Sequence, residues 1–150
     1  YNDDSVEKVD ENPEELSGLI LADGSPVVQF DRSRLGTYTE AIPADKLSLN
    51  AALESGPFRF TARATRFGEF TNVATSEAND TENDRKWIAD IEAGYVFGNG
   101  VEIYAGANNV FNTYPDQVRD PNSYGNGMYD TISPYGFTGG NWYVRAGYKW

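Results

Sequence analysis

The chain has 150 residues, enough for one domain with a core, and its 23 Asp and Glu against 12 Lys and Arg give a formal net charge of −11. This acidic balance argues against nucleic-acid binding, because a phosphate-binding surface needs clustered Lys and Arg. The sequence contains no Cys and no His, which excludes disulfides, thiol nucleophiles, imidazole bases and the commonest transition-metal ligands.

The first 45 residues are strongly acidic, with 11 carboxylates against three basic side chains, a local net charge of −8. Residues 2–15 (NDDSVEKVDENPEE) have the composition of a solvated, mobile segment. A Ca²⁺ site is the alternative, since hard cations prefer oxygen ligands, although the spacing of an EF-hand loop is absent. We expect one or two helical turns over 14–21, a short strand over 25–30 and a loop over 31–45.

Five runs of alternating apolar and polar residues follow. Alternation with a period of two predicts strands with one apolar and one polar face. The expected strands are 46–54, 58–68, 86–97, 101–111 and 141–150. None of the seven prolines falls inside these runs, as the hydrogen bonding of a strand ladder requires. The sequence therefore predicts an all-β fold, an antiparallel up-and-down meander.

The connections between these strands alternate in length. Ser55-Gly56-Pro57 and Gly98-Asn99-Gly100 are tight turns, whereas 71–85 and 112–140 are long polar loops. Alternate connections of a meander lie at the same end of the sheet, so the tight turns share one end and the long loops the other. Transmembrane β-barrels have this asymmetry, and strands of this length match what a tilted strand needs to cross the hydrocarbon. The pattern favours a membrane barrel. The sequence contains no run of about 18 apolar residues, so it predicts no transmembrane helix.

The charges of the expected strands lie on one face. The parity that runs from Leu47 to Trp150 carries only Arg66, at the outer end of its strand. The opposite parity carries, among others, these nine charges: Lys46, Glu54, Arg59, Arg63, Asp90, Glu92, Glu102, Arg145 and Lys149. A charge that faces lipid near the midplane costs about 2–4 kcal/mol, which accounts for the segregation.

Aromatic residues gather near both ends of the strands, as in the interfacial girdles of membrane barrels. The group at the tight-turn end is Phe58, Tyr95, Phe97, Tyr148 and Trp150, and the group at the long-loop end is Phe67, Phe70, Trp87, Phe111 and Trp142. A soluble antiparallel sandwich also has alternating strands and stays an alternative. It does not account for the one-sided loops, the two aromatic bands or the aromatic last residue.

Several motifs occur in a characteristic order. Residues 106–112 (GANNVFN) and Tyr114-Pro115-Asp116 form an Asn-hydrophobic-Phe run followed by Tyr, with Asn112 where Asp is usual. Residues 133–140 (SPYGFTGG) are small and aromatic, and 141–150 alternate up to a final Trp where Phe is commoner. Together these motifs resemble the C-terminal barrel region of TonB-dependent receptors of Gram-negative outer membranes, over about residues 25–150.

The resemblance implies the last five strands of a barrel of about 22 strands with a plugged lumen. It implies a place in the Gram-negative cell outer membrane, with the C-terminus on the periplasmic side and Tyr1 inside an extracellular loop. The implied partners are the rest of the barrel, the plug domain, the TonB complex, lipid and lipopolysaccharide, and a small-molecule ligand. The implied function is active uptake of a bulky, scarce nutrient such as a ferric siderophore, a cobalamin-like cofactor or an oligosaccharide. No enzymatic activity and no bound cofactor are expected.

Two groups of residues are candidates for a functional role. Aromatic side chains of the last long loop have the chemistry to stack on a sugar or a catechol: Tyr114, Tyr124, Tyr129, Tyr135 and Phe137. The alternative is that they order the loop by packing on each other. The apolar residues of the last strand form the expected barrel-assembly signal: Trp142, Val144, Ala146, Tyr148 and Trp150. Asp90 and Glu92 share a strand face, but nothing marks them as more than wall residues.

The sequence is therefore compatible with three functions. The first is a segment of an active outer-membrane transporter, as the resemblance implies. The second is a soluble β-sandwich module that binds carbohydrate through its Tyr-rich loop. The third is a passive, porin-like barrel built from several copies of the chain.

Overall fold

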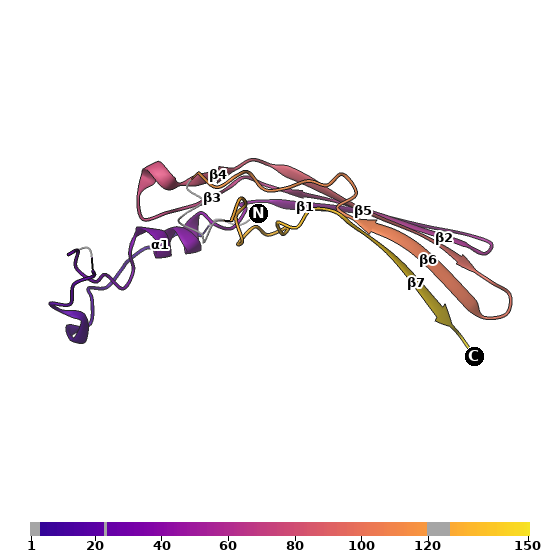
Figure 1. Cartoon of the computed structure of the whole chain (residues 1–150), viewed down its shortest axis with the longest axis horizontal. Coiled ribbons are helices and arrows are strands. Elements are labelled where there is room, and N and C mark those ends of the chain that lie inside the picture. Colours follow the sequence, from indigo (N-terminus) through magenta and orange to yellow (C-terminus); the bar gives the residue numbers. More distant parts are fainter. Residues whose placement is uncertain (1–3, 23, 120–126) are drawn as a thin grey trace.

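The computed structural model of the chain describes residues 4–22, 24–119 and 127–150. Its main element is an antiparallel sheet of five strands in the order β1-β2-β5-β6-β7 (Figure 1). The strands are β1 (Lys46–Ser55), β2 (Phe58–Phe67), β5 (Lys86–Val96), β6 (Val101–Asn108) and β7 (Asn141–Tyr148). The prediction of an all-β chain with five sequential antiparallel strands is confirmed.

Tight turns join the strands at one end of the sheet, where the chain also ends (Figure 1). Gly56 and Gly100 have φ values of 55° and 86°, which glycine adopts without the steric cost of a side chain. The other end of the sheet, called the loop end, contains residues 31–45, 68–85 and the described parts of 109–140. The one-sided distribution of the connections is thus present in the structure.

The loop end contains regular structure where the sequence predicts loops. Residues 31–45 include a helix, α1 (Arg32–Thr39), which begins at Asp31, whose side chain accepts a hydrogen bond from the Arg34 N–H at 2.9 Å. Residues 71–85 include the 3₁₀ turn η2 (Glu77–Asn79), and the short strands β3 (Phe70–Asn72) and β4 (Thr81–Asn83) pair with each other. Both loop predictions are wrong, because these short elements depend on contacts between distant segments.

The acidic N-terminal region has little regular structure. The expected helical turns over 14–21 reduce to one 3₁₀ turn, η1 (Glu14–Leu16), and the expected strand over 25–30 reduces to one bridge between Ile20 and Pro26. The side chain of Asn12 holds the second segment, donating to the Val27 carbonyl at 2.5 Å and accepting from the Gln29 N–H at 2.9 Å.

Strand β6 ends three residues earlier than the alternation predicts. Asn109 has a φ of 49°, a left-handed conformation that Asn tolerates better than most residues and that turns the chain out of the ladder. Its backbone N–H donates to Oδ1 of Asp90 at 2.9 Å. Its side-chain amide donates to the Thr113 carbonyl at 2.7 Å and accepts from the Thr113 N–H at 2.9 Å. The turn is therefore fixed by Asn109 itself.

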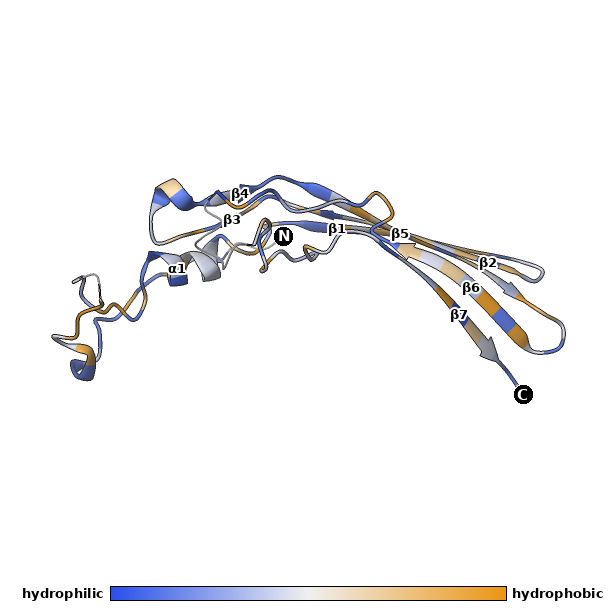
Figure 2. Cartoon of the chain, in the orientation of Figure 1, coloured by the Kyte–Doolittle hydropathy of each residue, from blue (hydrophilic) through white to orange (hydrophobic). Residues whose placement is uncertain are grey.

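The register places the apolar parities of all five strands on one surface, called the apolar face. Ala64 is opposite both Leu49 and Ala89, and Ala105 is opposite both Ala93 and Val144. The alternation of orange and blue along β6 in Figure 2 reflects the two faces. The large side chains of the apolar face stay exposed: 63% for Leu53, 75% for Val144 and 77% for Trp142, for example.

The core of the described residues lies near the loop end and not between two sheets. The buried apolar residues are Ala41, Phe67, Phe70, Val73, Ala74, Ala107 and Val118. Helix α1 approaches this core so closely that a Cβ on Gly36 would overlap the side chain of Val73. The sheet therefore carries a small packed cap at one end and two uncovered faces along the rest of its length.

Candidate functional site

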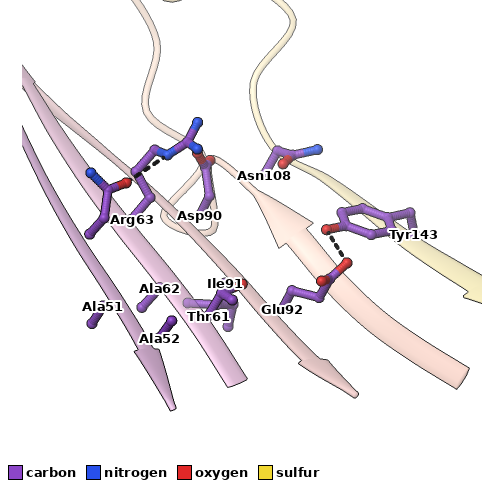
Figure 3. A pocket seen from close by; sticks show the side chains of 11 residues that line it. Ala51, Ala52, Thr61, Ala62, Arg63, Asp90, Ile91, Glu92, Asn108 and Tyr143 are labelled. Atoms are coloured by element: carbon purple, nitrogen blue, oxygen red, sulfur yellow. Dashed lines mark hydrogen bonds between the residues drawn. The ribbon is translucent and has the colours of Figure 1, made fainter. Parts of the chain in front are cut away.

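The polar face of the sheet, opposite the apolar face, contains a shallow hollow of about 430 Å³ (Figure 3). Residues of β1, β2, β5, β6 and β7 line it, because the same parity of each strand points to this side. Its polar lining includes Asn50, Thr61, Arg63, Asp90, Glu92 and Tyr143. Asp90 and Glu92, which the sequence marks only as wall residues, thus both line this hollow.

The hollow combines donors and acceptors with both signs of charge. Arg63 and Asp90 are register partners on β2 and β5 and lie side by side in Figure 3. The Nε of Arg63 donates to Oδ1 of Asn50 at 3.0 Å. Such a surface is suited to contact with water and with polar, mostly uncharged groups. In the described residues, no three His, Cys, Asp or Glu side chains are placed to hold a metal ion.

Glu92 is the most strongly engaged carboxylate of the hollow. It accepts hydrogen bonds from the Tyr143 hydroxyl at 3.0 Å and from Nε and Nη2 of Arg145, each at 2.9 Å. The guanidinium of Arg145 also lies 3.9 Å above the ring centroid of Tyr104. We call Glu92, Tyr104, Tyr143 and Arg145 the C-terminal bracket. Sequence reasoning placed the two charges on the polar face but did not pair them, because the pairing spans three strands.

The aromatic residues of the last long loop do not form one exposed set. Tyr114 and Tyr129 stack on each other, with ring centroids 4.9 Å apart and an interplanar angle of 17°. Tyr135 packs against Phe67 at 5.2 Å and Phe70 at 6.3 Å. This geometry fits the alternative in which the tyrosines order the loop.

The two remaining aromatic candidates differ from these three. Phe137 is 43% exposed, and Tyr124 lies outside the described residues. Burial raises the pKa of Tyr135 to about 12, as expected for a hydroxyl withdrawn from water in the cap. Tyr135 is therefore a packing residue of the cap, and Phe137 is the described candidate that is open to a ligand.

Residues of the motif after β6 anchor the loop to the sheet. Asp116 accepts hydrogen bonds from the Asp84 N–H and from Nζ of Lys86, each at 2.7 Å, and its own N–H donates to Oδ1 of Asn83 at 3.1 Å. Asn112, with a φ of 55°, accepts from the Gly140 N–H at 2.9 Å. These side chains act as structural ties between the loop and the strands next to it.

An ion pair fixes α1 to the segment between β3 and β4. Arg32 donates to both carboxylate oxygens of Asp80, at 2.7 and 2.5 Å, and to the Ala74 carbonyl at 2.6 Å. The Ala74 N–H in turn donates to Asp80 at 2.9 Å. The hydrogen bond from Arg32 is the main reason that the pKa of Asp80 falls to about 2.

The residues of the expected assembly signal are all exposed: four lie on the outer strand β7, and Trp150 follows its end. Trp150 is fully exposed, Tyr148 is 59% exposed, and Trp142, Val144 and Ala146 continue the same side of the strand. Strands β1 and β7 stand at the two edges of the described sheet, so each has one side without a strand partner there.

In the described ranges, no helix is long and apolar enough to cross a membrane. Comparison of the chain with models of known families, with curated proteins and with solved structures gives no match. Its class and function are therefore argued from the geometry above.

Proposed function

We propose that the chain is a wall segment of an outer-membrane active transporter of the TonB-dependent receptor class. The observation that carries this proposal is the apolar face, which runs unbroken over five strands and stays exposed. Burying one large apolar side chain contributes about 1.5–3 kcal/mol of free energy. With so many of them exposed, contact of the apolar face with an apolar phase is strongly favoured over contact with water. Lipid acyl chains are such a phase.

The one charge on the apolar parity supports the same assignment. Arg66 lies at the loop end of β2 and forms an ion pair with Asp45. A cation near the boundary of the hydrocarbon, paired with an acid, costs far less than one at the midplane. The soluble sandwich would instead need a second sheet over the apolar face, and the other described sheet has only the two short strands β3 and β4.

The two free strand edges set a requirement for the proposal. Backbone N–H and C=O groups cannot stay unpaired in hydrocarbon, so β1 and β7 need further strands beside them. In a closed barrel of about 22 strands, neighbouring strands pair with both edges. Together with a plug, such a barrel provides a path for the active uptake of a bulky nutrient. Under the proposal, the loop end faces the outside and the tight turns face the periplasm. The passive porin-like barrel differs by having no plug.

Detergent dependence tests the membrane assignment. The whole chain is refolded in plain buffer and in micelles of a nonionic detergent, and each sample is examined by size-exclusion chromatography and circular dichroism. We expect a β-rich species that stays in solution only with detergent and aggregates without it. A monodisperse, folded monomer in plain buffer would overturn the proposal and favour the soluble binding module.

A further inference from the structure

The polar side chains of β6 and β7 lean toward β5 across glycines. Tyr104 is the register partner of Gly94, and Tyr143 is the register partner of Gly106. A Cβ on Gly94 would overlap the Tyr104 ring, and a Cβ on Gly106 would lie 2.5 Å from Cζ of Tyr143. Each ring thus covers the backbone of the strand before its own, an arrangement that only glycine permits.

The gap at Gly106 lets β7 reach β5 directly. Tyr143 and Arg145 extend over β6 and give Glu92 three hydrogen bonds of 2.9 to 3.0 Å. The Glu92 side chain is 17% exposed, so its charge is largely withdrawn from water and depends on these donors. Figure 3 shows the Tyr143 hydroxyl meeting Glu92 above the intervening strand.

The apolar face cannot fix the position of β7 by itself. A slip of two residues along β6 keeps every apolar residue of β7 on the same side, because side chains alternate with a period of two. The polar face does discriminate. Such a slip would move Tyr143 from Gly106 to a position opposite Tyr104 or Asn108, which both carry side chains, and the slip toward Tyr104 would also place Arg145 opposite Glu102 and away from Glu92.

We propose that the C-terminal bracket sets the register of the terminal strand and that Glu92 is its positioning residue. In this view the aromatic residues of β7 determine which side faces outward, whereas Glu92 determines the height at which the free edge of β7 is presented to the next strand. The bracket lies within the sheet, so its role is the same whether the apolar face meets lipid or protein.

Disulfide cross-linking reads the register directly, because the native sequence contains no Cys. Ala105 and Val144 are register partners on the apolar face, so the pair Ala105→Cys/Val144→Cys reports the native register. The pair Ile103→Cys/Val144→Cys reports the slip of two residues that places Tyr143 opposite Tyr104. A third pair, Leu49→Cys/Ala64→Cys, joins β1 to β2 and serves as the monitor of folding.

We expect Glu92→Ala in the whole chain to lower the ratio of native to slipped cross-link by about tenfold, because it removes three charge-assisted hydrogen bonds. The matched control is Glu54→Ala, which removes a carboxylate that faces Arg59 at 3.4 Å on the same face, far from β7. It should leave the ratio unchanged. An unchanged ratio in Glu92→Ala, with the β1–β2 cross-link intact, would overturn the proposal.

The exchanged pair Glu92→Arg with Arg145→Glu decides the case in which Glu92→Ala does not fold. We expect it to restore the native cross-link, since the charges still meet across β6. Failure of the exchanged pair to restore either folding or register would also overturn the proposal. The same cross-links are read in detergent or in buffer, so a failure of the membrane assignment stays distinguishable from a failure of the bracket.

Discussion

At the scale of single residues, the cap at the loop end depends on a few side chains that tie distant segments together. Arg32 and Asp80 are the clearest pair, because one guanidinium satisfies both carboxylate oxygens and a backbone carbonyl. Asp116 has a similar role for the last long loop. The tie between Arg32 and Asp80 includes a carboxylate whose pKa is lowered by the pair, so its strength is expected to depend on pH.

We expect the docking of α1 to weaken in acid. The folded pKa of Asp80, about 2, lies below its ordinary value of 3.8, so its contribution is complete above pH 4 and is lost as the pH falls from about 4 to 2. Limited proteolysis by pepsin, across this range, measures the opening of residues 32–39. The control is Asp80→Asn, which should be cut more readily at pH 4 and show a smaller change toward pH 2. Equal pH profiles for the two proteins would contradict this account.

Sequence reasoning could not find these ties. The spacing of 48 residues between Arg32 and Asp80 carries no periodic signal, and neither residue belongs to an alternating run. The sequence offers mutual packing of the loop tyrosines as the alternative to ligand binding, but it does not indicate that Tyr114 stacks on Tyr129. Residue roles in the cap depend on which segments meet, and that information is absent from local patterns.

At the scale of elements, the strands of the main sheet were predictable because each carries its own signal. Alternation, tight turns with glycine and the exclusion of proline located all five within a few residues of their observed bounds. The short strands β3 and β4 and the helix α1 carry no such signal. These elements have only three to eight residues, most of them polar. They are stabilised by the N-cap of the helix and by packing at the loop end.

The two faces of β7 lead to opposite expectations for substitutions. Ala146→Arg places a charge on the apolar face opposite Ile103, at a cost of about 2–4 kcal/mol in lipid, and should block assembly. Lys149→Ala removes a 78% exposed side chain that lies 3.5 Å from Glu102 and should have a mild effect. The yield of membrane-inserted, heat-modifiable protein on gels measures both. Equal yields would refute the assignment of the faces.

At the scale of the whole molecule, the chain resembles a curved wall with a cap at one end. The cap holds the described core, while the wall has an apolar and a polar face along most of its length (Figures 1 and 2). A sheet without a core between its face and another layer is unusual for a protein in water. The proposed function requires that lipid covers the apolar face.

The three tryptophans of the chain allow a direct measurement, because Trp87 and Trp142 lie on the apolar face and Trp150 continues the same parity beyond the end of β7. The whole chain is reconstituted into phosphatidylcholine vesicles, and its tryptophan fluorescence is quenched either by lipids brominated on the acyl chains or by iodide in the water. The account predicts strong quenching by the brominated lipids and weak quenching by iodide. Strong quenching by iodide with no effect of the brominated lipids would contradict it.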